Sequence, residues 1–301
     1  MIKKEILIKI AIIVIVLFVS IFALISFNGI RIKQANIWMK SIDDNKLIVE
    51  MSIPGTHDSG ANHSIFDVSG KCQDLTINEQ LKIGVRFFDI RLQIVNNELN
   101  VVHSFVDQKQ KFIKVMNTIN TFIEENPSEF IIVSLKEDAD SKNSNIYFDE
   151  KLIDDLKLFN NVCYDNYLPQ YLSEARGKIY ILNRFTSNNF GIQAYMGWHD
   201  STSFNLESLY VQDNYCITDV EVKKQDIINT IEYGNSNNLL TLNFTSCYFD
   251  YGFPPTYAIP PAKIINKWLI DYINQNENQN LGIMVMDFVT KELCNEIIRR
   301  N

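Results

Sequence analysis

Residues 112–136 read FIKVMNTINTFIEENPSEFIIVSLK, and they combine the two kinds of element from which we predict the fold class. The first part, Phe112–Glu125, has the apolar periodicity of an amphipathic helix, and the Asn-Pro pair that follows ends it. The run Phe130–Leu135 is short and rich in Ile, Val and Phe, as a buried strand is, and it closes on the charged Lys136. A helix that leads directly into a buried strand is typical of α/β proteins.

The same alternation extends over the chain from Ile37 onward. Further strands are predicted at Val49–Ile53, Val85–Ile90, Asn100–His103, Lys178–Leu182, Leu239–Phe244 and Gly282–Asp287. Further helices are predicted at Val222–Glu232, from Pro261 through Ile273, and at Lys291–Arg299. Strands that alternate with helices imply a mainly parallel sheet, and about eight such units fit this length. We therefore expect residues 34–301 to form a single distorted (β/α)8 barrel of the TIM type.

The N-terminus is strongly apolar. Residues 6–28 read ILIKIAIIVIVLFVSIFALISFN, with no charged residue from Ile10 to Phe27. A helix of this length and hydropathy spans a bilayer, and the lysines before it favour a cytoplasmic N-terminus. We therefore expect residues 1–33 to form a hydrophobic helix, either a transmembrane anchor or a cleaved signal peptide, with weak cleavage sites after Ala23 or Ser26. Both readings place the body outside the cytoplasm, membrane-anchored or secreted.

Charge and cysteine usage exclude several classes of protein. The net charge is −8, and outside residues 1–33 the chain holds 23 basic and 35 acidic residues, a net −12. Because residues 34–301 are so acidic, they are a poor nucleic-acid binder, and their contact with a membrane must be apolar or specific rather than driven by charge. The five cysteines form no Cys-x-x-Cys pair, so we predict buried thiols rather than a zinc site or a disulfide framework, although export would allow one disulfide.

Polar residues follow or close the apolar runs. These polar residues are His57, Asp89, Arg91, His103, Lys136, Arg184 and Asp287. In barrels of this type the active site lies at the C-terminal ends of the strands. Two histidines on one rim can act as general base and general acid, an arginine can hold a phosphate, and a carboxylate can orient an imidazole. This set indicates phosphodiester cleavage in which a neighbouring hydroxyl attacks phosphorus, as in ribonucleases. Metal binding by the histidines and aspartates remains the alternative.

Eight motifs then occur in order along the chain. They are SIPGTHDSG (Ser52–Gly60), FFDIR (Phe87–Arg91), VVH (Val101–His103), NPSEFIIVSLK (Asn126–Lys136), ARGKIYILNRF (Ala175–Phe185), VQDNY (Val211–Tyr215), LNFTS (Leu242–Ser246) and GIMVMD (Gly282–Asp287). Together they resemble bacterial phosphatidylinositol-specific phospholipase C, of the phospholipase C X-domain superfamily, over residues 37–300.

The resemblance implies a metal-independent lyase. By this resemblance His57 takes the proton from the inositol 2-hydroxyl, and Asp287 holds His57 in the productive tautomer. His103, assisted by Asp58, would protonate the departing diacylglycerol oxygen. The products would be diacylglycerol and inositol 1,2-cyclic phosphate, which slow hydrolysis could then open.

The resemblance also implies how the substrate is held. Arg91 would bind and polarise the phosphate, with Asp89 helping to fix the site. The inositol contacts would be Lys136, Arg184 and Asp213 to the hydroxyls, and Tyr215 stacked on the ring.

Two features of the sequence bear on the metal and on the pocket. Calcium-dependent relatives carry Glu-x-Asp where this chain has Asp89-Ile90-Arg91, and the fixed charge of Arg91 would repel calcium. We therefore predict no metal and no other cofactor. The chain departs from the family after His103, where Ser104-Phe105 replaces Gly-Pro, so we expect a different local shape of the pocket there.

The segment Cys247–Ala258, CYFDYGFPPTYA, is rich in aromatic residues. It is either a loop packed on its own aromatics or a rim that enters the lipid interface through Tyr248, Phe249, Tyr251 and Phe253, the reading we favour. Its tyrosines could also hold choline headgroups. We expect a monomer that acts on phosphatidylinositol in membranes, and on glycosylated phosphatidylinositol anchors. Its rivals are a calcium-dependent phosphodiesterase of the same barrel family and a non-catalytic inositol-lipid-binding module.

Overall fold

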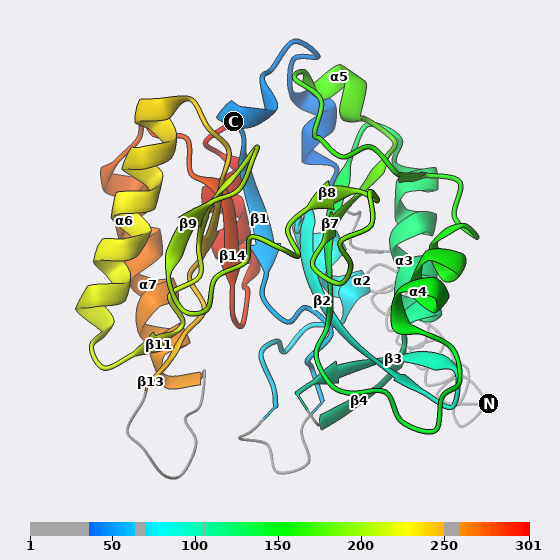
Figure 1. Ribbon diagram of the computed structural model, residues 1–301. Coiled ribbons are helices and arrows are strands. Elements are labelled where there is room, and N and C mark those ends of the chain that lie inside the picture. The colour runs from blue at the N-terminus through cyan, green and yellow to red at the C-terminus, as the bar shows by residue number, and fades with distance from the viewer. Residues whose placement is uncertain (1–35, 64–69, 105, 250–258) are drawn as a thin grey trace, which may run out of the picture. The chain divides into compact units, whose positions relative to one another are not determined.

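A twelve-stranded mixed sheet forms the centre of the computed structural model, which describes residues 36–63, 70–104, 106–249 and 259–301 (Figure 1). Eight parallel strands follow one another through it: β6 (Val162–Cys163), β7 (Ile179–Asn183), β5 (Ile131–Glu137), β2 (Phe87–Val95), β1 (Ser52–Thr56), β14 (Gly282–Met286), β12 (Thr241–Phe244) and β10 (Tyr210–Gln212). The others are β3 (Glu98–His103), β4 (Val106–Lys111), β8 (Ile192–Gln193) and β9 (Ser203–Asn205). Strands β11 (Cys216–Ile217) and β13 (Tyr248–Phe249) form a separate small sheet.

The strand order confirms the predicted distorted barrel. From β10 through β12, β14, β1, β2 and β5 to β7, neighbours in the sheet follow the order of the chain, as in TIM-type barrels. Within the described residues no ladder joins β7 or β8 to β9 or β10, so the barrel is open there. The opening coincides with residues 184–209, which contain no helix to cover that side.

Helices cover the outer face of the sheet. In Figure 1, α6 (Val220–Asn237) and α7 (Ile259–Gln275) flank one half of the sheet, and α3 (Phe112–Glu125) and α4 (Phe148–Leu156) flank the other. The remaining helices are α2 (Ile77–Ile83), α5 (Leu172–Ala175), α8 (Lys291–Ile298) and the 3-10 turns Trp38–Ser41 and Ile48–Glu50.

The elements form largely where their residue patterns predict. Helix α3 has the predicted bounds, and it buries one face with the spacing of an amphipathic helix: Phe112, Val115, Met116, Ile119, Phe122 and Ile123. The first five residues of β5 are buried, whereas Lys136 and Glu137 emerge at its C-terminal end. The bounds of several strands are shifted by a few residues, and two strands differ in a way that matters for the site. The ladder of β1 starts only at Ser52, opposite Gly282 of β14, and β3 is an antiparallel addition to β2 rather than a barrel strand.

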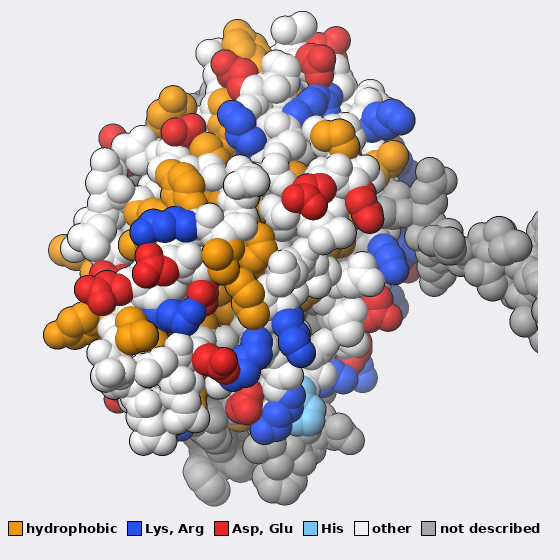
Figure 2. Space-filling model, turned by 90° about the vertical axis from the view of Figure 1, so that its right-hand side faces the viewer, with side chains coloured by type: hydrophobic (Ala, Val, Ile, Leu, Met, Phe, Trp, Pro, Cys, Tyr) orange, Lys and Arg blue, Asp and Glu red, His pale blue; other side chains and the backbone are white. Residues whose placement is uncertain are grey.

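The predicted N-terminal helix at residues 1–33 lies outside the described residues. Within the described part of the chain, none of the helices combines the length and the hydropathy that crossing a bilayer requires. On the face drawn in Figure 2, basic and acidic side chains are interspersed rather than gathered by sign.

Candidate active site

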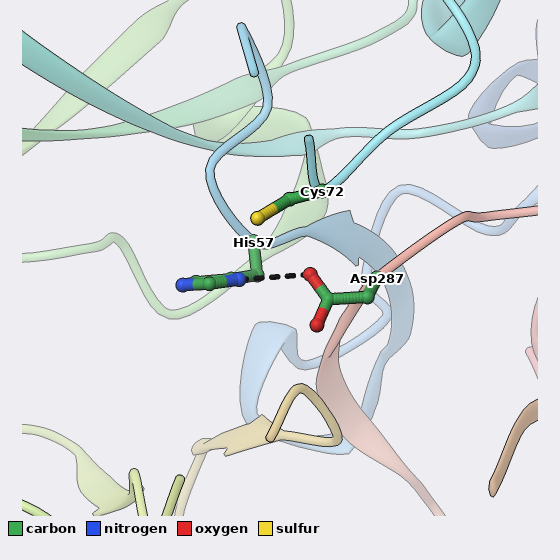
Figure 3. A group of neighbouring side chains, drawn as sticks. All are labelled: His57, Cys72 and Asp287. Carbon is green, nitrogen blue, oxygen red and sulfur yellow. Dashed lines mark hydrogen bonds and ion pairs between the residues drawn. The ribbon is translucent and has the colours of Figure 1, made fainter. Parts of the chain in front are cut away.

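The pairing of β1 with β14 brings His57 and Asp287 together. Thr56 lies opposite Met286 in the parallel ladder, so the residues that follow leave the two strands side by side. The His57 backbone N–H donates to the Met286 carbonyl at 3.0 Å, and its Nδ1 lies 2.8 Å from Asp287 Oδ1 (Figure 3). The two residues are 230 positions apart in sequence, and only the sheet register makes them neighbours.

Arg91 reaches the same point from β2. Its Nη2 lies 2.7 Å from His57 Nε2 and 3.2 Å from Asp89 Oδ2, and its Nε lies 3.5 Å from Asp58 Oδ2. Burial lowers its pKa, but the carboxylates of Asp58, Asp89 and Asp138 raise it more, so the pKa lies well above its usual range. The guanidinium is therefore a permanent charge fixed beside the imidazole.

The contacts of His57 determine its tautomer. A guanidinium can only donate hydrogen bonds, so Nε2 must be the acceptor, and the ring proton sits on Nδ1 and is donated to Asp287. Burial lowers the pKa of His57 and Arg91 lowers it further, but the Asp287 carboxylate outweighs them and the pKa is raised above 6.5. The neutral imidazole therefore turns its lone pair away from Asp287 and toward Arg91.

Asp89 holds the cationic groups from beneath. It is fully buried, and its Oδ1 lies 3.3 Å from Arg184 Nη1 and from the Ser134 hydroxyl. Burial raises its pKa, but Arg91 and Arg184 lower the pKa more, so the group stays an anion. Asp89 thus fixes two guanidinium groups without itself lining the pocket.

His103 comes from the hairpin β3–β4 rather than from the barrel. The Nε2 of His103 lies 3.5 Å from Asp58 Oδ2. Asp58 is fully buried, and burial raises the pKa of its carboxyl group more than Arg91 and His103 lower it. The departure at Ser104 has a visible consequence here. Ser104 adopts φ 51°, a conformation that favours glycine, the residue that the family resemblance leads us to expect at this point.

A pocket of about 840 Å³ joins these groups. Of the predicted site residues, it is lined by His57, Arg91, His103, Lys136, Arg184, Asp213, Tyr215, Tyr248 and Asp287. Asp58 and Asp89 lie beneath its surface, with no exposed area. Phe249 does not line it, and Tyr251 and Phe253 lie outside the described residues.

Several residues that line the pocket were not predicted as site residues, among them Asp138, Trp198 and Asp200. Asp138 follows Lys136 by two positions and accepts its hydrogen bond at 2.9 Å. Burial raises the pKa of Asp138, but Arg91 and Lys136 bring it down to about 2. Its position two residues after the predicted Lys136 is the feature of the sequence that could have indicated Asp138 as a pocket residue.

Trp198 joins two of the predicted substrate-binding residues. Its Nε1 donates to Asp213 Oδ2 at 3.0 Å, and Arg184 lies over its ring, 3.5 Å from the centroid. Asp200 accepts the hydroxyl hydrogen bond of Tyr215. Trp198 and Asp200 come from the irregular segment between β8 and β9, where no periodic pattern marks a position.

Two groups of side chains in the described residues have the donor atoms for a cation. They are His57 with Cys72 and Asp287, and Asp58 with Cys72 and His103, each with ligand atoms within 4.8 Å of one another. Calcium takes six to eight oxygen ligands, and neither group supplies such a set. All five cysteines are free thiols.

Comparisons with known proteins agree with this geometry. Residues 51–185 match the family model of the phosphatidylinositol-specific phospholipase C X domain. The chain is 27% identical to a 1-phosphatidylinositol phosphodiesterase of Listeria monocytogenes, over 91% of this chain and 86% of that protein. It is 28% identical to one of Staphylococcus aureus, over 85% of this chain and 89% of that protein.

Solved structures extend the agreement to the fold. A phosphatidylinositol-specific phospholipase C from Staphylococcus aureus matches with a TM-score of 0.79 at 28% identity, over 89% of this chain and 97% of that one. The enzyme from Listeria monocytogenes matches with a TM-score of 0.70 at 26% identity, over 89% and 98% of the two chains. The strand order and these matches lead to one conclusion: residues 51–185 carry the features of the phosphatidylinositol-specific phospholipase C X domain, and the chain is similar in sequence and fold to bacterial enzymes of that type.

Proposed function

We propose that this chain is a metal-independent phospholipase C that cleaves phosphatidylinositol to diacylglycerol and inositol 1,2-cyclic phosphate. The observation that carries the proposal is the state of His57, whose Nδ1 proton is donated to Asp287 while its Nε2 accepts from Arg91. An imidazole whose neutral form keeps its lone pair on Nε2, beside a fixed cation, suits proton removal from a hydroxyl next to a phosphate.

The reaction then follows from the placement of the groups. His57 Nε2 takes the proton of the inositol 2-hydroxyl, and the oxygen forms a bond to phosphorus. The bond from phosphorus to the glycerol oxygen breaks, and His103 gives that oxygen its proton, supported by Asp58 at 3.5 Å. Arg91 binds the phosphate, and its charge, rather than that of a metal, offsets the charge that develops on the phosphate oxygens.

The remaining pocket residues supply the inositol subsite. Lys136, Arg184 and Asp213 offer donors and an acceptor to the ring hydroxyls, and Tyr215 offers a face for stacking. An open pocket of this kind also supports action on glycosylated phosphatidylinositol anchors.

Membrane contact is proposed at the aromatic rim. Tyr248 lines the pocket, and its ring lies 5.7 Å from that of Tyr215, so the rim is continuous with the proposed substrate site. Tyr248→Ala should weaken binding to phosphatidylinositol vesicles. Tyr171→Ala, which changes an exposed tyrosine beside Leu47 before β1, should not. Equal binding by both variants would contradict this part of the proposal. Residues 1–33 have the pattern of an anchor or signal peptide, which supports a location outside the cytoplasm, and we propose that the protein acts there as a monomer.

Substitution of His57 separates the proposed function from its rivals. His57→Ala should abolish turnover of phosphatidylinositol in detergent micelles and keep vesicle binding. His63→Ala changes an exposed histidine outside the pocket and is the matched control, with turnover expected to stay unchanged. Turnover by His57→Ala at the rate of the control would refute the assignment of the base. Absence of turnover in the unmodified chain would point to a binding module, and turnover only with calcium would point to the calcium-dependent alternative.

A further inference from the structure

The Cys72 thiol lies between the two histidine–aspartate pairs, and the proposed reaction does not use it. The Cys72 backbone N–H donates to the Ala61 carbonyl, and its carbonyl accepts from the Phe288 N–H, both at 2.8 Å. These bonds tie the residue to the segments that follow β1 and β14. Its Sγ lies within 4.8 Å of ligand atoms from both pairs, and Figure 3 shows the thiol beside the His57–Asp287 hydrogen bond.

The two pairs differ in how fully their polar atoms are used. Both ring nitrogens of His57 are engaged, one by Asp287 and one by Arg91, although Asp287 Oδ2 accepts no hydrogen bond from the described residues. Asp58 is fully buried, yet neither of its carboxylate oxygens accepts a hydrogen bond from the described residues, and both of its ion-pair contacts there are at 3.5 Å. His103 Nδ1 likewise has no hydrogen-bond partner in the described part of the chain. Buried acceptors without donors are costly, and a cation would satisfy them.

We propose that Asp58, Cys72 and His103 form a binding site for a thiophilic divalent cation such as Zn²⁺ or Cd²⁺, and that this cation inhibits the enzyme reversibly. Three protein ligands of the types Asp, Cys and His make an open tetrahedral zinc site, with bonds of about 2.0–2.3 Å. The ligand atoms lie within 4.8 Å of one another, so with such bond lengths they need to close by at most about 1 Å. Cys72 and His103 line the pocket, so a cation can enter and a water molecule can take the fourth position.

The site selects its cation by the thiol. A cation that binds the Cys72 sulfur displaces the thiol proton to solvent. Calcium and magnesium prefer oxygen ligands and do not displace it, whereas zinc and cadmium bind thiolate strongly. The guanidinium of Arg91, 3.5 Å from Asp58, further disfavours any cation that gains no thiolate bond.

Inhibition rests on the proposed function, because it depends on His103 being the general acid. A cation on the imidazole of His103, and on the Asp58 that supports it, leaves no proton for the departing glycerol oxygen. Binding itself does not depend on the reaction and is measured without substrate.

Cobalt provides the direct test of binding, since Co²⁺ occupies zinc sites and a thiolate bond gives a near-ultraviolet charge-transfer absorption. The full chain in detergent with a phosphine reductant should show this absorption on titration with Co²⁺, as should Cys163→Ser and Cys247→Ser. Cys72→Ser should bind at least about 10- to 100-fold more weakly and lose the absorption, because even outer-sphere partners change affinity by this much. His103→Gln, which keeps the thiol, should also weaken binding. Persistence of the absorption in Cys72→Ser, or its loss in Cys247→Ser, would overturn the assignment.

The activity test uses the same variants, each relative to its own activity with EDTA. Zn²⁺ should inhibit cleavage of phosphatidylinositol by the unmodified chain and by Cys163→Ser, and EDTA should restore it. Cys72→Ser should resist the same zinc concentration, and calcium should have no effect on any variant. Cobalt binding through Cys72 without zinc inhibition would refute the inhibitory role. A chain that binds cobalt but never cleaves the lipid would refute the proposed function and leave the cation site standing.

Discussion

Replacement of Asp287 by Asn tests the His57–Asp287 pair with the smallest change of shape. The carboxylate is 2% exposed, and its Oδ1 lies 2.8 Å from His57 Nδ1. Because the imidazole becomes positive when it takes the substrate proton, the contact strengthens as the reaction proceeds. A hydrogen bond to a charged group contributes about 1.5–3 kcal/mol. At about 1.4 kcal/mol for each tenfold change in rate, kcat should fall roughly 10- to 150-fold.

The pH profile gives a second readout of the same substitution. The Asp287 charge raises the pKa of His57 against the lowering effects of burial and Arg91, so its removal must lower that pKa. A general base works in its neutral form, so the acid limb of kcat should move to lower pH in Asp287→Asn.

The assay is initial-rate cleavage of phosphatidylinositol in mixed micelles from pH 5 to pH 8. The value of kcat should fall more than KM rises, because Asp287 acts on the base and not on the inositol ring. A kcat within threefold of the unmodified chain, or an acid limb that does not move, would refute the reasoning.

Two further predictions concern stability, measured by urea unfolding of the full chain. Glu129→Gln should lower the free energy of unfolding by about 3–5 kcal/mol, because it leaves the buried Arg86 without its partner carboxylate at 2.8 Å; a loss below 1 kcal/mol would contradict this. Lys223 is fully buried, and burial lowers its pKa from 10.5 to about 8. The folded chain therefore releases this proton at lower pH than the unfolded chain. The free energy of unfolding should rise between pH 8 and 10.5, by up to about 3 kcal/mol for this group, and Lys223→Met should remove that part of the rise. The same slope in both proteins would show that Lys223 does not titrate in this range.

The sequence predicts the sites that depend on parallel strand register. His57 and Asp287 each follow an apolar strand, and parallel neighbours end at the same edge, so their meeting follows from the pattern. The same holds for Arg91 and Lys136, which lie opposite each other on β2 and β5. The amphipathic pattern of α3 likewise predicts its bounds, because its buried positions recur at helical spacing.

The parts that the sequence does not predict lack such a pattern. The hairpin β3–β4 pairs antiparallel to β2, and a short apolar run does not reveal in which direction it pairs. Trp198 reaches the pocket from an irregular segment whose course depends on its tertiary contacts with Arg184 and Asp213. The position of Cys72 between the two histidine–aspartate pairs depends on backbone hydrogen bonds with Ala61 and Phe288, which are far apart in the sequence.

The central claim is that His57 and His103 cleave phosphatidylinositol by intramolecular attack, with Arg91 in place of a metal. Phosphorus NMR of the full chain in detergent micelles with phosphatidylinositol and excess EDTA tests it most directly. We expect a signal of inositol 1,2-cyclic phosphate as the first product. Product that forms only when calcium replaces EDTA, or acyclic inositol phosphate as the first product, would contradict it.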